Sequence, residues 1–80
     1  MQKKWMDVWN EAITNDELEA HIPKWVQDDI IQFCKGMDEN DRLYLDDYWN
    51  EALSSINSAQ YDCISKSEAD YLRGKYIFKK

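Results

Sequence analysis

Apolar residues recur along most of this chain at spacings of three and four positions, which is the spacing of one face of an α-helix. Trp5, Trp9 and Ile13 follow this pattern and predict a helix over residues 3–14. Polar residues that can cap a helix come next, and a short helical turn is expected over residues 16–20.

Pro23 opens the next patterned segment, because a proline fits the first turn of a helix, where its missing N–H group has no intrahelical partner to lose. We expect this helix over residues 23–35, ended by Gly36 in the left-handed conformation that glycine adopts readily. Trp25 falls outside the apolar stripe of this helix and is therefore predicted to be exposed. The expected buried stripe contains Val26, Ile30, Phe33 and Cys34.

A third helix is expected over residues 39–57, where the acidic residues at its start suit the positive end of a helix dipole. Arg42 is placed to form ion pairs with Asp38 and Asp46, each four positions away. The apolar stripe of this helix contains Leu45, Tyr48, Trp49, Ala52, Leu53 and Ile56.

The last third of the chain leaves two points open. Residues 57–60 predict a break, although a helical turn over 59–64 also fits this stretch. Ser65, three positions before a glutamate, has the form of a capping box and predicts a last helix over residues 66–76. The apolar residues 76–78 fit either the end of this helix or an extended tail packed on the bundle.

These segments predict an all-α fold, a small single-domain bundle of four to five short helices. The 80 residues suffice for one hydrophobic core, so residues 1–80 are interpreted as a single acidic helical domain. Residues 7–13, Asp-Val-Trp-Asn-Glu-Ala-Ile, resemble residues 47–53, Asp-Tyr-Trp-Asn-Glu-Ala-Leu. This similarity indicates either two pseudo-repeated helical hairpins, 1–36 and 37–80, or convergence between two amphipathic helices.

Charge is distributed unevenly along the chain. Sixteen acidic and ten basic residues give a net charge of −6, and the acidic residues dominate everything except the two ends. Such a body repels nucleic acid and anionic lipid and attracts basic partners, although an acidic surface can also serve solubility alone. No apolar run approaches the roughly 20 residues of a membrane span, and residues 1–10 lack a secretory signal. We therefore expect a cytoplasmic protein that binds neither membranes nor nucleic acid directly.

No motif indicates catalysis, a metal or a cofactor. Cys34 and Cys63 are the only cysteines, and the lone His21 is far from both in sequence, so a zinc site lacks a ligand set. Both thiols are expected to be reduced, with Cys34 in the core. Residues 38–49 lack the glycine and the final glutamate of a calcium-binding loop. The expectation is a protein that is not an enzyme and holds neither a metal nor a cofactor.

Pairs of carboxylates one helical turn apart are the most informative pattern. Asp7 with Glu11, and Asp47 with Glu51, lie opposite the inward-facing tryptophans of their segments. Like charges at this spacing destabilise a helix by roughly 0.2–0.5 kcal/mol, so each pair indicates either a cation-binding face or an ordinary solvated face. The predicted partner-binding residues are Asp7, Glu11, Trp25, Asp28, Asp29, Asp46, Asp47 and Glu51.

The leading hypothesis is a non-catalytic protein-binding module or inhibitor, of the type that phages and mobile elements encode. Its acidic helical face would dock on the basic surface of a larger protein, for example a nucleic-acid-binding protein or a nuclease complex, and imitate the charge of phosphates. The alternative is a small structural or adaptor protein that forms a homodimer through an aromatic interface, since a core this small seldom supplies more than about 3–5 kcal/mol. A transcriptional regulator is a weaker alternative, because its DNA contacts would have to come from the basic C-terminal residues alone.

Overall fold

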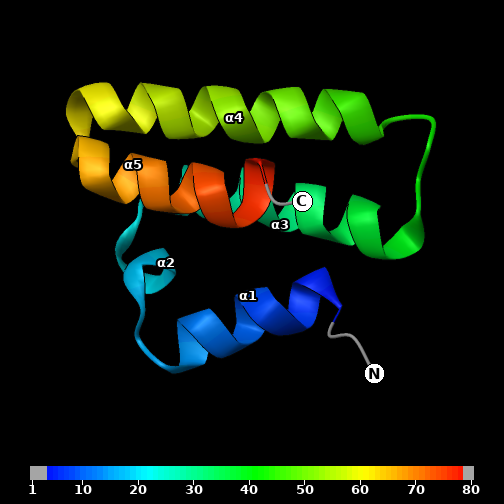
Figure 1. Cartoon of the computed structure of the whole chain (residues 1–80), viewed down its shortest axis with the longest axis horizontal. Coiled ribbons are helices and arrows are strands. Elements are labelled where there is room, and N and C mark those ends of the chain that lie inside the picture. The colour runs from blue at the N-terminus through cyan, green and yellow to red at the C-terminus, as the bar shows by residue number, and fades with distance from the viewer. Residues whose placement is uncertain (1–3, 79–80) are drawn as a thin grey trace.

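The computed structural model describes residues 4–78, and this part of the chain consists of helices and their connections without a strand. The helices are α1 (Trp5–Thr14), α2 (Leu18–His21), α3 (Lys24–Glu39), α4 (Leu45–Asp62) and α5 (Lys66–Leu72), and a π-helical segment, η1 (Arg73–Ile77), continues α5. Helices α1, α3, α4 and α5 alternate in direction, and α2 lies in the connection between α1 and α3 (Figure 1). The predicted all-α small bundle is confirmed.

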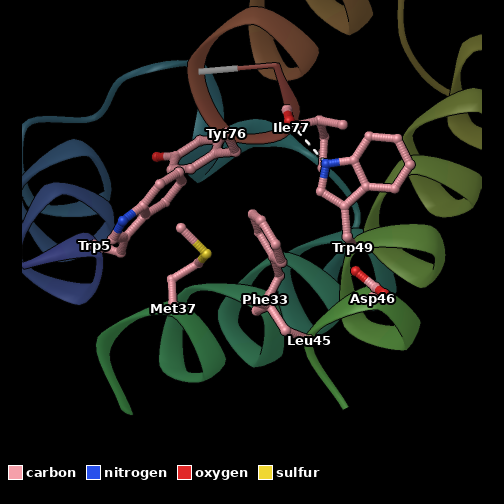
Figure 2. A pocket seen from close by; sticks show the side chains of 8 residues that line it. All are labelled: Trp5, Phe33, Met37, Leu45, Asp46, Trp49, Tyr76 and Ile77. Carbon is pink, nitrogen blue, oxygen red and sulfur yellow. Dashed lines mark hydrogen bonds between the residues drawn. The ribbon is translucent and has the colours of Figure 1, made fainter. Parts of the chain in front are cut away.

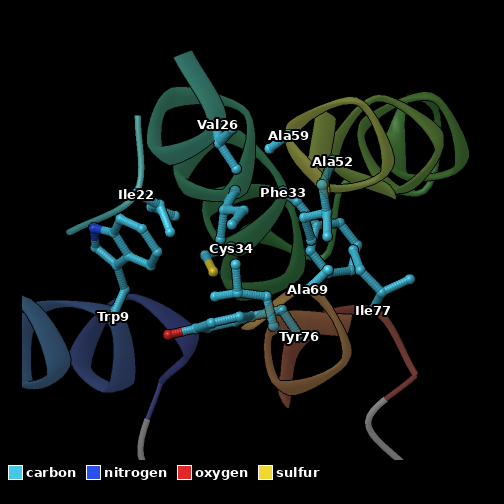
Figure 3. Packing of buried hydrophobic residues seen from close by; sticks show 13 residues of the cluster. Trp9, Ile22, Val26, Phe33, Cys34, Ala52, Ala59, Ala69, Tyr76 and Ile77 are labelled. Carbon is cyan, nitrogen blue, oxygen red and sulfur yellow. The ribbon is translucent and has the colours of Figure 1, made fainter. Parts of the chain in front are cut away.

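The two longest helices, α3 and α4, form the most extensive helix–helix contact of the described chain, and α4 lies along the edge of the view opposite α1 (Figure 1). Helix α1 packs on α3, whereas α5 and η1 pack on α4. Each large apolar side chain that is fully buried stabilises the fold by roughly 1.5–3 kcal/mol, so one shared core can hold these helices together. That core (Figure 3) contains Trp9, Ile22, Val26, Ile30, Phe33, Cys34, Ala52, Ile56, Ala59, Ala69, Leu72, Tyr76 and Ile77. It includes all four residues of the apolar stripe predicted for the helix over residues 23–35, which are Val26, Ile30, Phe33 and Cys34.

Helix α1 begins at Trp5 rather than at residue 3, which lies outside the described residues. Its first N–H groups are satisfied by a residue far along the chain. The N–H groups of Trp5 and Met6 donate to the two carboxylate oxygens of Asp38 at 2.7 and 2.9 Å. The predicted ion pairs of Arg42 are wrong, because the chain turns between α3 and α4 and the pairs would require one continuous helix there.

The prediction that Gly36 ends the second long helix is wrong. Helix α3 continues to Glu39, and Asn40 adopts the left-handed cap conformation with φ 54° and ψ 45°. Gly36 is buried within the helix because α4 crosses it closely. A Cβ atom at this position would lie 2.8 Å from Cδ2 of Tyr48 and 3.3 Å from Cδ1 of Leu45. The glycine therefore serves helix packing rather than chain reversal.

Helix α4 differs from its prediction at both ends. It begins at Leu45 rather than at residue 39, and the predicted break at residues 57–60 is wrong, because the helix continues to Asp62. Ile56 and Ala59 are both fully buried and lie one turn apart, so the apolar stripe runs through the polar stretch. The polar residues between them point away from the core.

The C-terminal segment confirms one prediction and decides between the two alternatives for residues 76–78. Ser65 caps α5, since its Oγ accepts a hydrogen bond from the Glu68 N–H at 3.1 Å, which confirms the serine cap of the predicted capping box. Tyr76 and Ile77 are buried inside the π-helical turn rather than in an extended tail, and Phe78 just after them is exposed. The short helical turn predicted over residues 16–20 is present as α2, which begins at Leu18 and ends at His21.

The two similar segments occupy different surroundings. Trp9 is buried and its ring packs on Tyr76 with a centroid distance of 5.8 Å. Trp49 is half-buried, and its indole N–H donates to the Ile77 carbonyl at 2.8 Å. The proposed boundary between two hairpins at residue 36 falls inside α3. Both tryptophans nevertheless contact the same C-terminal segment.

Candidate protein-interaction site

A hollow of about 410 Å³ lies between α3 and α4, and we call it the polar hollow. Trp25 and Asp29 of α3 face α4 across it, and α4 supplies Glu51 and three serines. The small serine side chains leave room beside the large Trp25 ring. Trp25 is 46% exposed, which confirms the prediction that its side chain lies outside the stripe of α3. The residues of the polar hollow are Trp25, Asp29, Glu51, Ser54, Ser55 and Ser58.

The floor of the polar hollow is tied together by a hydrogen bond. Ser55, which is 9% exposed, donates its hydroxyl to Oδ2 of Asp29 and so joins α4 to α3. Glu51 on the rim is exposed, and within residues 4–78 neither Asp29 nor Glu51 forms an ion pair with a lysine or an arginine. The hollow therefore combines negative charge with an exposed indole ring.

The described basic residues of the C-terminal third, Lys66, Arg73 and Lys75, form ion pairs away from the polar hollow. Lys66 and Arg73 pair with Asp70 on their own helical segment, and Lys75 pairs with Glu17 and Glu19 of the α2 region. None of these pairs involves α3 or α4. Within residues 4–78, these bases therefore do not neutralise the carboxylates around the polar hollow.

The structure brings together only part of the predicted set. Trp25, Asp29 and Glu51 share the polar hollow, and the exposed Asp28 lies next to it in α3. Asp47 is exposed one helical turn before Glu51. The remaining three lie elsewhere. Asp46 lines a different hollow, whereas Asp7 and Glu11 are exposed on α1, at the opposite edge of the bundle from α4 (Figure 1).

The second hollow, which we call the aromatic hollow, has a volume of about 270 Å³ and lies where α1, α3, α4 and η1 meet (Figure 2). Trp5 and Phe33 form an edge-to-face pair in its wall, with centroids 5.5 Å apart. Sequence reasoning missed this hollow, because it depends on how the C-terminal segment folds back. Its residues are Trp5, Phe33, Met37, Leu45, Asp46, Trp49, Tyr76 and Ile77.

A buried polar cluster that the sequence did not reveal links α2 to η1. Glu19 is fully buried, and its Oε1 accepts hydrogen bonds from Lys75 Nζ at 2.5 Å and from the Tyr76 hydroxyl at 2.9 Å. Tyr71 lies within reach of the same oxygen, at 3.5 Å. The one sequence signal available was the position of Glu19 four residues before Pro23, between two helices, and that signal is too weak to predict burial.

The cluster serves structure rather than nucleophilic chemistry. Burial by itself would lower the pKa of Lys75, but the hydrogen bonds to Glu19 and Tyr71 outweigh burial and raise this pKa above its ordinary value. Burial, reinforced by the hydrogen bond to Glu19, also raises the pKa of Tyr76. Both shifts favour Lys75 as a cation and Tyr76 as a neutral phenol, the forms in which these groups are weak nucleophiles.

Three further features bear on the class of site. Among residues 4–78, no group of three or more His, Cys, Asp or Glu side chains is arranged to hold a metal ion. None of the helices in this described range combines the length and the apolar character that crossing a bilayer requires. Cys34 is buried, Cys63 is exposed, and the two thiols are not joined to each other.

Comparisons of this chain with protein-family models, with curated proteins and with solved structures find no match.

Proposed function

We propose that this chain is a non-catalytic protein-binding module, acting as an inhibitor, whose acidic α3–α4 face docks on the basic surface of a larger protein. The observation that carries the proposal is the polar hollow. It places the exposed ring of Trp25 beside the carboxylates of Asp29 and Glu51, which form no ion pair with a described base. The same face continues through the exposed Asp28 and Asp47.

Such a face is suited to arginine- and lysine-rich surfaces for two reasons. Carboxylates accept charge-assisted hydrogen bonds from guanidinium groups, and a tryptophan ring attracts the cation through its π-face. Tryptophan is also enriched among the residues that dominate interface energies. The serines around Trp25 are small enough to leave the ring accessible and can hydrogen-bond to a partner.

A nucleic-acid-binding protein is the partner class that we propose. Asp47 and Glu51 lie one helical turn apart, about 6 Å along the axis of α4, which is of the order of the distance between neighbouring phosphates of one strand. A rigid helix that carries charges at this spacing would compete with DNA or RNA for the same basic surface. Phage and mobile-element inhibitors are the context in which this device would be useful.

The alternative of a homodimer draws support from a different observation. Leu43 and Tyr44, adjacent in the turn between α3 and α4, are 77% and 51% exposed, so this turn presents two neighbouring large side chains to solvent. A dimer interface would cover them. Sedimentation equilibrium distinguishes the two proposals: a concentration-independent monomer excludes the homodimer, whereas a stable dimer that buries Tyr44 would favour it.

The experiment for the proposed function compares the wild type with a variant of the polar hollow. The tagged chain captures partners from lysate of its source cells, and mass spectrometry compares the wild type with the triple variant Trp25→Ala, Asp29→Asn, Glu51→Gln. The matched control is the double variant Asp7→Asn, Glu11→Gln. It also removes two negative charges, but from α1 at the opposite edge of the bundle.

We expect a protein with a basic surface to bind the wild type and the control but not the triple variant. The complex should weaken steeply as salt rises, and nucleic acid should displace the chain from its partner. Equal capture by the wild type and the triple variant contradicts the proposal. A complex that is indifferent to salt and to nucleic acid contradicts it as well.

A further inference from the structure

The aromatic hollow combines features that the proposed function does not use. Four aromatic rings, from Trp5, Phe33, Trp49 and Tyr76, line a space of about 270 Å³. Figure 2 shows the side chains of Trp5, Met37, Phe33 and Tyr76 pointing toward one another, with Trp49 on the other side of Phe33. Small-molecule sites usually measure about 300–1,000 Å³, so this hollow is suited to a single side chain.

Among the described residues that line the hollow, one is charged, and that residue is negative. Asp46 lines it from the first turn of α4 and is exposed, and within residues 4–78 no lysine or arginine pairs with its carboxylate. None of the described basic side chains lines the hollow either. A carboxylate beside aromatic faces favours an organic cation, since both attract positive charge and the rings also accept an apolar stem.

We propose that the aromatic hollow receives one arginine side chain of the protein partner. Arginine fits better than lysine because its planar guanidinium stacks on aromatic rings and donates two parallel hydrogen bonds to one carboxylate. Because the occupant comes from the basic partner, this inference rests on the proposed function. It adds a second anchoring pocket to the recognition that we propose for the polar hollow.

The position of Trp49 provides a direct readout of occupancy. Its indole N–H donates to the Ile77 carbonyl at 2.8 Å at the edge of the hollow, so a guest would shift the NMR signal of this N–H. Trp25 lies in the polar hollow and reports on that site separately. The two indole signals therefore distinguish binding in one hollow from binding in the other.

The experiment titrates the full chain, labelled with ¹⁵N, with N-acetylarginine amide into the high-millimolar range, because an isolated side chain binds weakly. N-acetylcitrulline amide, which has nearly the same shape without the charge, is the probe control. Asp46→Asn is the test variant, and Asp62→Asn is its matched control, because Asp62 is an exposed carboxylate of the same helix and does not line the hollow.

We expect the arginine probe, and not the citrulline probe, to shift the Trp49 indole signal. Asp46→Asn should weaken this binding about threefold to tenfold, whereas Asp62→Asn should leave it within about a factor of two. Equal binding of citrulline, equal effects of the two variants, or no shift of Trp49 overturns the inference. A shift confined to Trp25 also overturns it while leaving the proposed function intact, since that outcome places the cation in the polar hollow.

Discussion

Lys75 and Glu19 form an ion pair in which the ammonium nitrogen lies 2.5 Å from Oε1, and this pair joins η1 to α2. Replacing Lys75 with methionine would leave the fully buried Glu19 without its cation. We expect Lys75→Met to lower the free energy of unfolding by about 3 kcal/mol, because an uncompensated buried charge is strongly destabilising. Urea unfolding followed by circular dichroism measures this change.

The control for this prediction is Lys66→Met. Lys66 pairs with Asp70 at 3.8 Å on the exposed surface of α5, where solvent screens the attraction, so its loss should have little effect. Equal effects of the two substitutions would mean that the Lys75–Glu19 pair does not stabilise the fold beyond a surface contact.

Lowering the pH should remove the contribution of the Asp70 carboxylate to the stability of the folded state. The hydrogen bond from Arg73 lowers the pKa of Asp70 below its ordinary value of 3.8. A carboxyl group whose pKa is lowered by folding stabilises the folded state above its ordinary pKa, and this contribution is lost as the pH falls through the lowered pKa. The stability difference between the wild type and Asp70→Asn should therefore be present at neutral pH and vanish as the pH falls below 3.8.

Urea unfolding over a series of pH values tests this dependence. Asp62→Asn is the control, since Asp62 is exposed at the end of α4 and forms no ion pair with a base in residues 4–78. A stability difference for Asp70→Asn that grows toward acidic pH would contradict the prediction.

The two glycines should respond oppositely to the same substitution. Alanine at Gly36 places a Cβ atom 2.8 Å from the ring of Tyr48, so we expect destabilisation by about 1–2 kcal/mol despite the better helix propensity of alanine. Alanine at Gly74 meets no atom within 4 Å and should stabilise by about 0.5–1 kcal/mol. Thermal unfolding of both variants checks the signs, and a stabilising Gly36→Ala would mean that α3 and α4 separate at little cost.

The Asp38 carboxylate stabilises α1 but destabilises α3. The sign of the change in the free energy of unfolding when Asp38 is replaced shows which effect is larger. Its carboxylate accepts the first two N–H groups of α1, but it lies in the last turn of α3, where the helix dipole disfavours a negative charge. We expect the capping role to dominate, so that Asp38→Ala destabilises the protein by about 1–2 kcal/mol. Asp28→Ala, at an exposed position of the same helix, should stay within about 0.5 kcal/mol. A neutral Asp38→Ala would show that the cap contributes nothing.

Local patterns predicted the features that depend on neighbouring residues. The stripe of α3, the capping box at Ser65 and the exposure of Trp25 all follow from spacing within one helix. Gly36 was misassigned because its role depends on Tyr48, a residue of another helix, and propensity alone favours a helix end at glycine. The predicted break at residues 57–60 failed for a similar reason, because burial of Ala59 against the core overrides the polar neighbours.

The candidate site was predictable only in part. Trp25, Asp29 and Glu51 were chosen from charge and periodicity, and the packing of α3 on α4 places them together. Asp7 and Glu11 occupy the same positions in their segment as Asp47 and Glu51 do in theirs. Position along a helix does not determine where that helix lies in the bundle, and α1 lies at the opposite edge from α4 (Figure 1). Nor could spacing reveal the aromatic hollow or the burial of Glu19, because both depend on the return of η1.

Tyr76 and Glu19 are 57 positions apart in the chain, yet they share a hydrogen bond in the core. Helices of this size form within about a microsecond, whereas bringing such distant segments together carries a larger entropic cost. Refolding should therefore be limited by the arrival of the Tyr76 segment between preformed helices. The indole fluorescence of Trp9 and Trp49 would report that late event, because both rings contact this segment.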